Sequence, residues 1–315
     1  MSAQWRQQRE GGGRFSLWLI RFISLHFGRG FARLWLHPIA LYYFLRRGPE
    51  RRASRQYLER ITGMPVSHAQ VIHHIHCFAA TLLDRIFLLA RGDRDFEIEV
   101  EGLELLHETI DRGKGLLLVG SHQGSFEALR AVSQRRPDVP LRVVLDKQKT
   151  PAMTKLLEAL APQVGASVID ASRDGTSITL AMAEATSRGE MVALLADRAR
   201  PGEHCRHAQF LGRSAPFPIG PWLMASVLKV PVVLCFGLYM GGNRYKLIFE
   251  IMADRVEIPR ALRAHALDQL ISRYAQRLEH YAHVAPYNWF NFYDFWHDDG
   301  ADAGMDHIQP SSAGA

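Results

Sequence analysis

The chain has 315 residues, of which 47% are hydrophobic and 22% are charged, a composition typical of a globular protein. Its net charge of +6 is confined to the N-terminal region: residues 1–60 hold twelve arginines, no lysine and three acids, giving +9, and the rest carries −3. This distribution argues against a generally basic nucleic-acid-binding protein. The three cysteines, Cys77, Cys205 and Cys235, are far apart, which gives no disulfide framework and suits a reducing compartment.

Apolar runs alternate with arginines near the N-terminus, at residues 15–20, 22–25 and 34–45. Each run is shorter than the roughly 20 uninterrupted apolar residues of a spanning helix, and Pro38 should kink the last one. No small-residue cleavage site indicates a removed signal peptide. Aromatic residues interleaved with arginine are typical of helices at a bilayer surface. We therefore expect residues 1–60 to associate with a membrane, lying on it or crossing it once; the alternative is a buried helical hairpin with its arginines outward.

Residues 50–90 have helical periodicity, with a break at Thr62-Gly63-Met-Pro65. The second helix carries four histidines, of which His73 and His76 could share one face. No acidic or thiol ligand accompanies them at a known metal-ligand spacing, so we expect neither a metal nor a cofactor.

From residue 96 onward, short apolar runs alternate with amphipathic helices. The expected strands are residues 96–100, 116–119, 141–145, 167–169, 192–196, 230–238 and 245–251, and the expected helices lie near 103–112, 125–135, 151–161, 175–188, 219–228 and 260–283. This alternation predicts an α/β fold with a mixed, mostly parallel central sheet covered by helices. We expect this domain to span residues 61–297, with a helical lead-in to about residue 95. The segment 298–315 reads as a disordered tail.

One segment, Gly120-Ser-His-Gln-Gly-Ser-Phe-Glu127, combines a histidine and an acid directly after a strand expected to be buried on both faces. Reacting groups in open α/β sheets gather at the carboxyl ends of strands. Glu127, in the first helical turn, could accept a hydrogen bond from one ring nitrogen of His122 and leave the other free to remove a proton. Chance alone supplies such a spacing, so a helix-capping acid beside an incidental histidine is an equal alternative. A nucleophilic Ser121 or Ser125 is a rival, although the segment lacks the Gly-x-Ser-x-Gly elbow.

At these residues the chain resembles the lysophospholipid acyltransferase superfamily, and within it the bacterial lipid A biosynthesis (lauroyl/myristoyl) acyltransferases. The resemblance rests on the His-x4-Asp/Glu block, here His122 to Glu127. It continues through Phe210-Leu-Gly212, Pro216 and Gly220 as a third block and Pro231-Val-Val-Leu234 as a fourth. It covers most of residues 15–297, including an aromatic stretch at residues 286–296.

The resemblance implies direct acyl transfer without an acyl-enzyme, at the cytoplasmic face of a bacterial inner membrane. His122 would act as general base on an acceptor hydroxyl, and the donor would be an acyl thioester of acyl carrier protein or of coenzyme A. For the oxyanion we expect backbone amides at Gly124 and Ser125 and the side chain of Arg198. Arg213 is expected to meet a phosphate of the acceptor or of the carrier. For both arginines the alternative is an ordinary solvated side chain.

Two departures from the family pattern leave the acceptor open. The chain reads Asp146-Lys147-Gln-Lys149 where the relatives carry an Arg-bearing second block, and Asp197-Arg198 where they carry Asp-Gln. The acceptor could therefore be a lipid A-like molecule, an aminolipid, another glycolipid or a polyene-like lipid. The same pair could serve an acyl hydrolase, or be vestigial in a non-catalytic membrane- or carrier-binding protein. The aromatic stretch at residues 286–296 is expected to pack in the core; the alternative is an interfacial belt.

Overall fold

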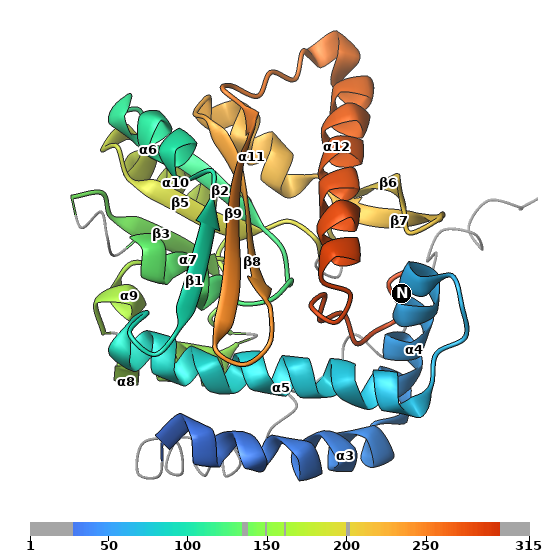
Figure 1. Ribbon diagram of the computed structural model, residues 1–315. Helices are drawn as coiled ribbons and strands as arrows, with labels where there is room; N and C mark the ends of the chain where they lie inside the picture. Colours follow the sequence, from blue (N-terminus) through green and yellow to red (C-terminus); the bar gives the residue numbers. More distant parts are fainter. Residues whose placement is uncertain (1–27, 134–137, 149, 161, 200–201, 297–315) are drawn as a thin grey trace, which may run out of the picture.

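The computed structural model describes residues 28–133, 138–148, 150–160, 162–199 and 202–296. Seven strands form one sheet in the order β1-β9-β8-β2-β5-β3-β4 (Figure 1). Their bounds are β1 Glu97–Glu101, β2 Leu116–Gly120, β3 Leu141–Leu145, β4 Val168–Asp170, β5 Met191–Leu195, β8 Val232–Tyr239 and β9 Arg244–Ala253. Only the β8–β9 pair is antiparallel among these. The predicted mixed, mostly parallel α/β sheet is confirmed, with each strand boundary within two residues of the expected one.

Helices cover both faces of the sheet (Figure 1). They are α6 Leu103–Asp111, α7 Phe126–Ser133, α8 Pro151–Leu160, α9 Pro162–Ala166, α10 Gly175–Ser187, α11 Gly220–Leu228 and α12 Arg263–Val284, with a short 3-10 turn, Arg260–Leu262, before the last. The central strand β2 is buried along its whole length, as its unbroken apolar run predicts. Its alternate residues serve two cores: Leu117 and Val119 pack in one, and Leu116 and Leu118 in the other.

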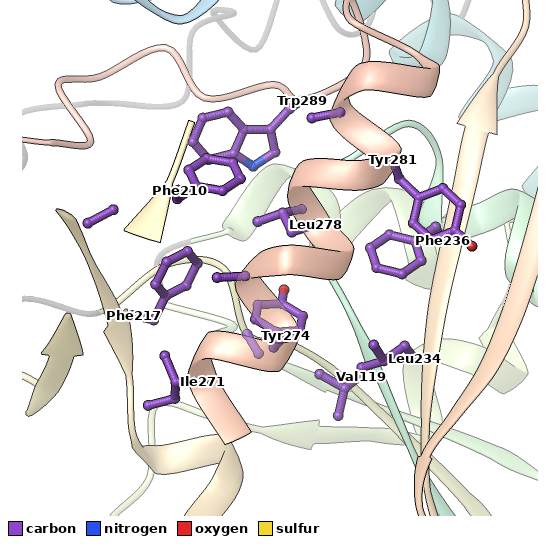
Figure 2. Packing of buried hydrophobic residues seen from close by; sticks show 14 of the residues in the cluster. Val119, Phe210, Phe217, Leu234, Phe236, Ile271, Tyr274, Leu278, Tyr281 and Trp289 are labelled. Carbon is purple, nitrogen blue, oxygen red and sulfur yellow. The ribbon is translucent and has the colours of Figure 1, made fainter. Parts of the chain in front are cut away.

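The core on the α12 side is rich in aromatic rings (Figure 2). Tyr274, Leu278 and Tyr281 of α12 lie between the sheet residues and the rings of Phe210 and Phe217. The aromatic stretch after α12 joins the same core, where Trp289, Phe295 and Trp296 are buried. The structure thus confirms core packing for this stretch.

A two-stranded hairpin, β6 Cys205–Phe210 and β7 Arg213–Pro218, packs against α12 and was not predicted. Two prolines in β7 argue against a strand within a large sheet, but they are tolerated in a separate ribbon. The turn places Leu211 at φ 49° and Gly212 at φ 76°. Positive φ at both central residues is what a tight hairpin turn of this kind requires.

In the described N-terminal part, a helical segment at residues 28–34 precedes the helices α3 Leu36–Arg46, α4 Gly48–Thr62 and α5 His68–Arg91. The break predicted at Thr62–Pro65 is confirmed, because α4 ends at Gly63 with φ 67°. Ser67 and Gln70 then form a capping box at the start of α5. Helical structure is interrupted at Trp35 ahead of Pro38, in agreement with the expected kink. The apolar runs at 15–20 and 22–25 and the tail 298–315 lie outside the described residues.

Among the described residues, one helix is long and apolar enough to cross a membrane: α5, His68–Arg91. However, 61% of its apolar window is buried inside the protein. Its residues Leu83, Phe87 and Leu88 belong to the core beneath the sheet, so α5 is accounted for as a core helix.

Candidate active site

The site lies where β2 and β5 end side by side. The two strands pair in parallel with Gly120 opposite Leu195, so the residues that follow them, His122 and Asp197, emerge at the same edge of the sheet. His122 Nδ1 lies 2.8 Å from Asp197 Oδ1. The backbone N–H of His122 donates to Asp197 Oδ2 over 3.0 Å. Histidine and aspartate are therefore joined through both carboxylate oxygens.

A third donor holds the same carboxylate from the far end of the chain. Trp289 Nε1 donates to Asp197 Oδ2 over 3.1 Å, and Phe290 N donates to the carbonyl of His122 over 3.0 Å. The Asp197 side chain is completely buried. A buried carboxylate that receives three hydrogen bonds is fixed in position, and so is the ring that it binds.

The hydrogen bond at Nδ1 determines what the imidazole can do. With its Nδ1–H directed at Asp197, the neutral ring carries its lone pair on Nε2. The His122 side chain exposes 36% of its surface, and no hydrogen bond from the described residues occupies Nε2. The arrangement presents an accessible, oriented base.

Burial and a nearby positive charge keep that base neutral near pH 7. Burial, and after it the charge of Arg198, lowers the pKa of His122, although Asp197 acts in the opposite direction. Burial alone would raise the pKa of the Asp197 carboxyl, but the contacts with His122 and Arg198 lower it to about 2. At neutral pH the pair therefore consists of an unprotonated imidazole and an ionised carboxylate.

Glu127 takes a different direction from the one expected. It lies in the first turn of α7, and its Oε1 is 2.8 Å from Arg85 Nε of α5. Its Oε2 accepts a longer hydrogen bond, 3.4 Å, from Ser125 Oγ. Among the described residues no hydrogen bond joins Glu127 to His122, and Asp197 takes that place at the ring. The charge of Arg85 nevertheless contributes to the lowered pKa of His122, so the Arg85–Glu127 pair lies within electrostatic range.

The turn at Gly124 and Ser125 explains this direction. Gly124 has φ 67°, and a Cβ there would lie 1.9 Å from the carbonyl oxygen of Gly237. Gly124 N donates to the Asn288 carbonyl over 2.9 Å, and Ser125 N donates to the Gly237 carbonyl over 2.7 Å. The chain is thereby drawn against β8 before α7 begins. Both amides expected to face an oxyanion are used to hold this turn.

The two serines considered as nucleophiles occupy other roles. Ser125 is buried, and its Oγ accepts from Ala128 N over 3.3 Å at the start of α7. Within the described part of the chain, Ser121 Oγ is buried and without a hydrogen-bond partner, and neither hydroxyl bonds to His122. A serine nucleophile needs such a bond to its base, so this geometry does not favour one.

The two arginines expected at the site, Arg198 and Arg213, lie in different surroundings. Arg198 lies within electrostatic range of His122: its Nη2 donates to the Phe290 carbonyl over 2.5 Å, and its Cζ lies 5.7 Å from the ring centre of Tyr293. Arg213 begins β7 and is exposed. It lies close enough to Arg60 to lower the pKa of that guanidinium, after the larger effect of burial. Arg213 thus neighbours Arg60, and among the described residues no hydrogen bond or ion pair joins it to His122 or Asp197.

Buried polar atoms without partners gather around this centre. Among the described residues, Ser121 Oγ, both amide atoms of Gln123, Arg198 Nε and Asn291 Oδ1 have none. All four residues lie within two positions of His122, Asp197 or Trp289. Native proteins leave few buried polar groups unpaired, so this concentration is consistent with a place that receives a polar ligand or water.

Sequence reasoning missed Asp197 and Trp289 as members of the site. Asp197 had a usable signal, since it follows a buried strand in the same way as His122 does. Trp289 had none, because only the fold brings the end of the chain to β5.

Comparison with known families gives one finding. Residues 17–297 match the sequence model of a family described as bacterial lipid A biosynthesis acyltransferase. A comparison with curated proteins gives no match.

Proposed function

Because the chain belongs to the bacterial lipid A biosynthesis acyltransferase family, we propose that it moves a fatty acyl chain from an acyl thioester to a hydroxyl of a membrane lipid. The family makes it an acyltransferase that acts in lipid A biosynthesis. The proposal adds the donor, acyl carrier protein or coenzyme A, and the acceptor, a lipid A-like molecule or another membrane glycolipid. The observation that carries it is the imidazole of His122, oriented by Asp197 and open at Nε2.

The reaction proceeds by direct transfer. Nε2 of His122 takes the proton of the acceptor hydroxyl while the oxygen attacks the thioester carbonyl. The tetrahedral intermediate collapses as the C–S bond breaks, and the departing thiolate takes the proton back from Nε2. One C–O bond forms, one C–S bond breaks, and the histidine ends neutral. General base catalysis of this kind contributes about 10²–10⁴-fold.

In this scheme Asp197 orients the base and stabilises the imidazolium as it forms. Arg198 supplies the positive charge that stabilises the developing oxyanion, because it acts on His122 and its Nε is buried without a partner among the described residues. Glu127 acts indirectly: it pairs with Arg85, whose positive charge lowers the pKa of His122.

The outer face of α3 supports contact with a bilayer. The helix buries Leu36, Ala40 and Phe44 toward the protein, and it lies on the outside of the molecule (Figure 1). Large apolar side chains are exposed on and just before it: Phe31, Leu34, Trp35, Leu41, Tyr42 and Leu45. Aromatic and aliphatic side chains beside arginines are what a helix at the lipid interface presents. We place the enzyme at the cytoplasmic face of a bacterial inner membrane, with this face toward the lipid.

The test is lipid mass spectrometry of cells that lack the gene and are complemented with wild type, His122→Ala or His265→Ala. His265 is an exposed histidine on α12 that bonds to Gln269, and it serves as the matched control. We expect the deletion to accumulate a lipid that lacks one acyl chain, restored by wild type and His265→Ala but not by His122→Ala.

The same strains separate the rival functions. The same lipid composition in every strain would contradict the proposed acyl transfer. A hydrolase would instead release free fatty acid from acylated acyl carrier protein, and the rate of release by the purified protein would not depend on added lipid. Full restoration by His122→Ala would show that the protein acts without this base.

A further inference from the structure

Helix α5 carries a group of side chains that the catalytic site does not use. His74 is fully buried, with Nδ1 2.8 Å from Ser54 Oγ and Nε2 3.1 Å from the Trp289 carbonyl oxygen. His73, His76 and Cys77 form a separate group on the same helix. Their three ligand atoms all lie within 4.8 Å of one another. His73 Nε2 and Cys77 Sγ are 3.7 Å apart.

This spacing is close to what a tetrahedral metal centre requires. A zinc ion with Zn–N bonds of about 2.0 Å and a Zn–S bond of about 2.3 Å holds its ligand atoms about 3.3–3.8 Å apart. The separation of His73 and Cys77 falls in that range. The ligand atom of His76 lies within 4.8 Å of both, as residues i, i+3 and i+4 share a helical face.

The neighbouring helix supplies a fourth candidate ligand. α3 lies alongside α5 (Figure 1), and the rings of His37 and His76 have their centres 4.6 Å apart. The sequence alone gave no reason to join His37 to this group, because it lies 36 positions before His73. Three imidazoles and one thiolate form a donor set that suits zinc and other borderline-soft ions.

The group is only partly enclosed: Cys77 is buried, His76 is half-buried and His73 is exposed, so an ion could reach the three side chains from solvent. Arg33 is the nearby cation, and its guanidinium is occupied by Asp84, Tyr239 and the Gly242 carbonyl.

We propose that His73, His76 and Cys77, with His37 as the fourth ligand, bind one zinc ion that fastens α3 to α5. The site does not involve His122, so it is independent of the acyl transfer reaction. It would fix the helix that carries the exposed apolar face against the body of the enzyme.

The direct test is metal titration of the full-length protein after treatment with a chelator. We expect one equivalent of zinc by elemental analysis, and with cobalt(II) a tetrahedral visible spectrum with a thiolate-to-cobalt charge-transfer band. This reading needs no variant. Failure to bind zinc, or a cobalt complex without the thiolate band, would overturn the site.

Variants then assign the ligands. Cys77→Ser and His73→Ala should each weaken zinc binding at least tenfold, because loss of even an outer-shell partner costs about 10–100-fold. Cys205→Ser and His68→Ala should leave it unchanged. Cys205 is a half-buried thiol on β6, and His68 is an exposed histidine at the start of the same helix. His37→Ala should weaken binding and lower the melting temperature gained with zinc. Equal binding by the Cys77→Ser protein and the wild type would contradict the assignment.

Discussion

The segments that follow β2 and β5 each deliver a buried carboxylate to the neighbourhood of one histidine, and they hold it in different ways. Asp197 lies directly after β5, has no exposed surface, and bonds to the ring and backbone of His122. Glu127 lies on the same segment as the histidine but turns to Arg85 on another helix. Asp197 contacts His122 because β2 and β5 are neighbouring parallel strands, whereas Glu127, only five positions away in sequence, does not bond to it. Asp197 is therefore the carboxylate that orients the imidazole, and Glu127 pairs with Arg85 close by.

The largest effect is expected from Asp197→Asn, which keeps the shape of the side chain and removes its charge. An amide facing Nδ1 favours the wrong tautomer, and the imidazolium loses its counter-charge, so turnover should fall about 10³-fold or more. The pKa of His122 should drop further, which moves the acid limb of the pH–rate profile to lower pH. Acyl transfer rates measured from pH 5 to 8 check both expectations.

A matched control for this change is Asp174→Asn. Asp174 caps α10 by accepting from Ser177 N over 2.9 Å, and asparagine caps a helix equally well. It should keep wild-type turnover. A loss in Asp197→Asn no greater than in the control would break the assignment of Asp197.

Arg198→Gln is expected to have the next largest effect, a fall in turnover of about 10²-fold, because its positive charge stabilises the oxyanion in the proposed mechanism. It also tests the electrostatics in the opposite sense from Asp197→Asn. The charge of Arg198 lowers the pKa of His122, so its removal should raise that pKa toward 6.5 and move the acid limb to higher pH. The base must be unprotonated to act, hence activity should be lost earlier on acidification. An acid limb that stays in place would show that Arg198 does not reach the imidazole.

Glu127→Gln should affect stability more than chemistry. The change leaves the partly exposed Arg85 guanidinium without its carboxylate, at a cost of about 1–3 kcal/mol in the free energy of unfolding. Turnover should fall about tenfold or less, since the effect on His122 is indirect. Urea unfolding and acyl transfer rates measured on the same preparation separate the two quantities.

The control for Glu127 is Glu190→Gln, at the opposite end of β5. Glu190 is also buried and paired with arginines, Arg142 at 2.7 Å and Arg188 at 2.9 Å. It should lose stability without losing turnover. If Glu127→Gln instead matched Asp197→Asn in turnover at unchanged stability, Glu127 would be in direct contact with the base during the reaction.

Local sequence patterns predicted most of the fold. The run Leu116–Val119 identified its strand because burial on both faces leaves an unbroken apolar sequence. The hairpin of β6 and β7 escaped because its strands mix charged residues and proline and bury only part of their surface. Its stability comes from packing on α12, and no local pattern contains that information.

The site divides in the same way. His122 was found because its position after a buried strand is visible in sequence, and the same rule would have marked Asp197. Trp289 lies 92 positions after Asp197, and His37 lies on a different helix from His76. Contacts of this kind depend on tertiary packing, so they are absent from any spacing pattern.

The smallest effect is expected from the tryptophan that steadies the pair. Trp289→Phe removes the hydrogen bond from Nε1 to Asp197 Oδ2 and keeps most of the ring packing. A hydrogen bond to a charged group is worth about 1.5–3 kcal/mol. Part of this free energy is recovered when water bonds to the carboxylate, so turnover should fall about three- to tenfold.

Trp222→Phe is the matched control: Trp222 is equally buried, and among the described residues its Nε1 has no partner. Both changes should lower stability through lost packing, but only Trp289→Phe should shift the acid limb of the pH–rate profile, because it alone alters the carboxylate that bonds to His122. Equal turnover in the two variants would mean that Asp197 holds His122 without help from the end of the chain.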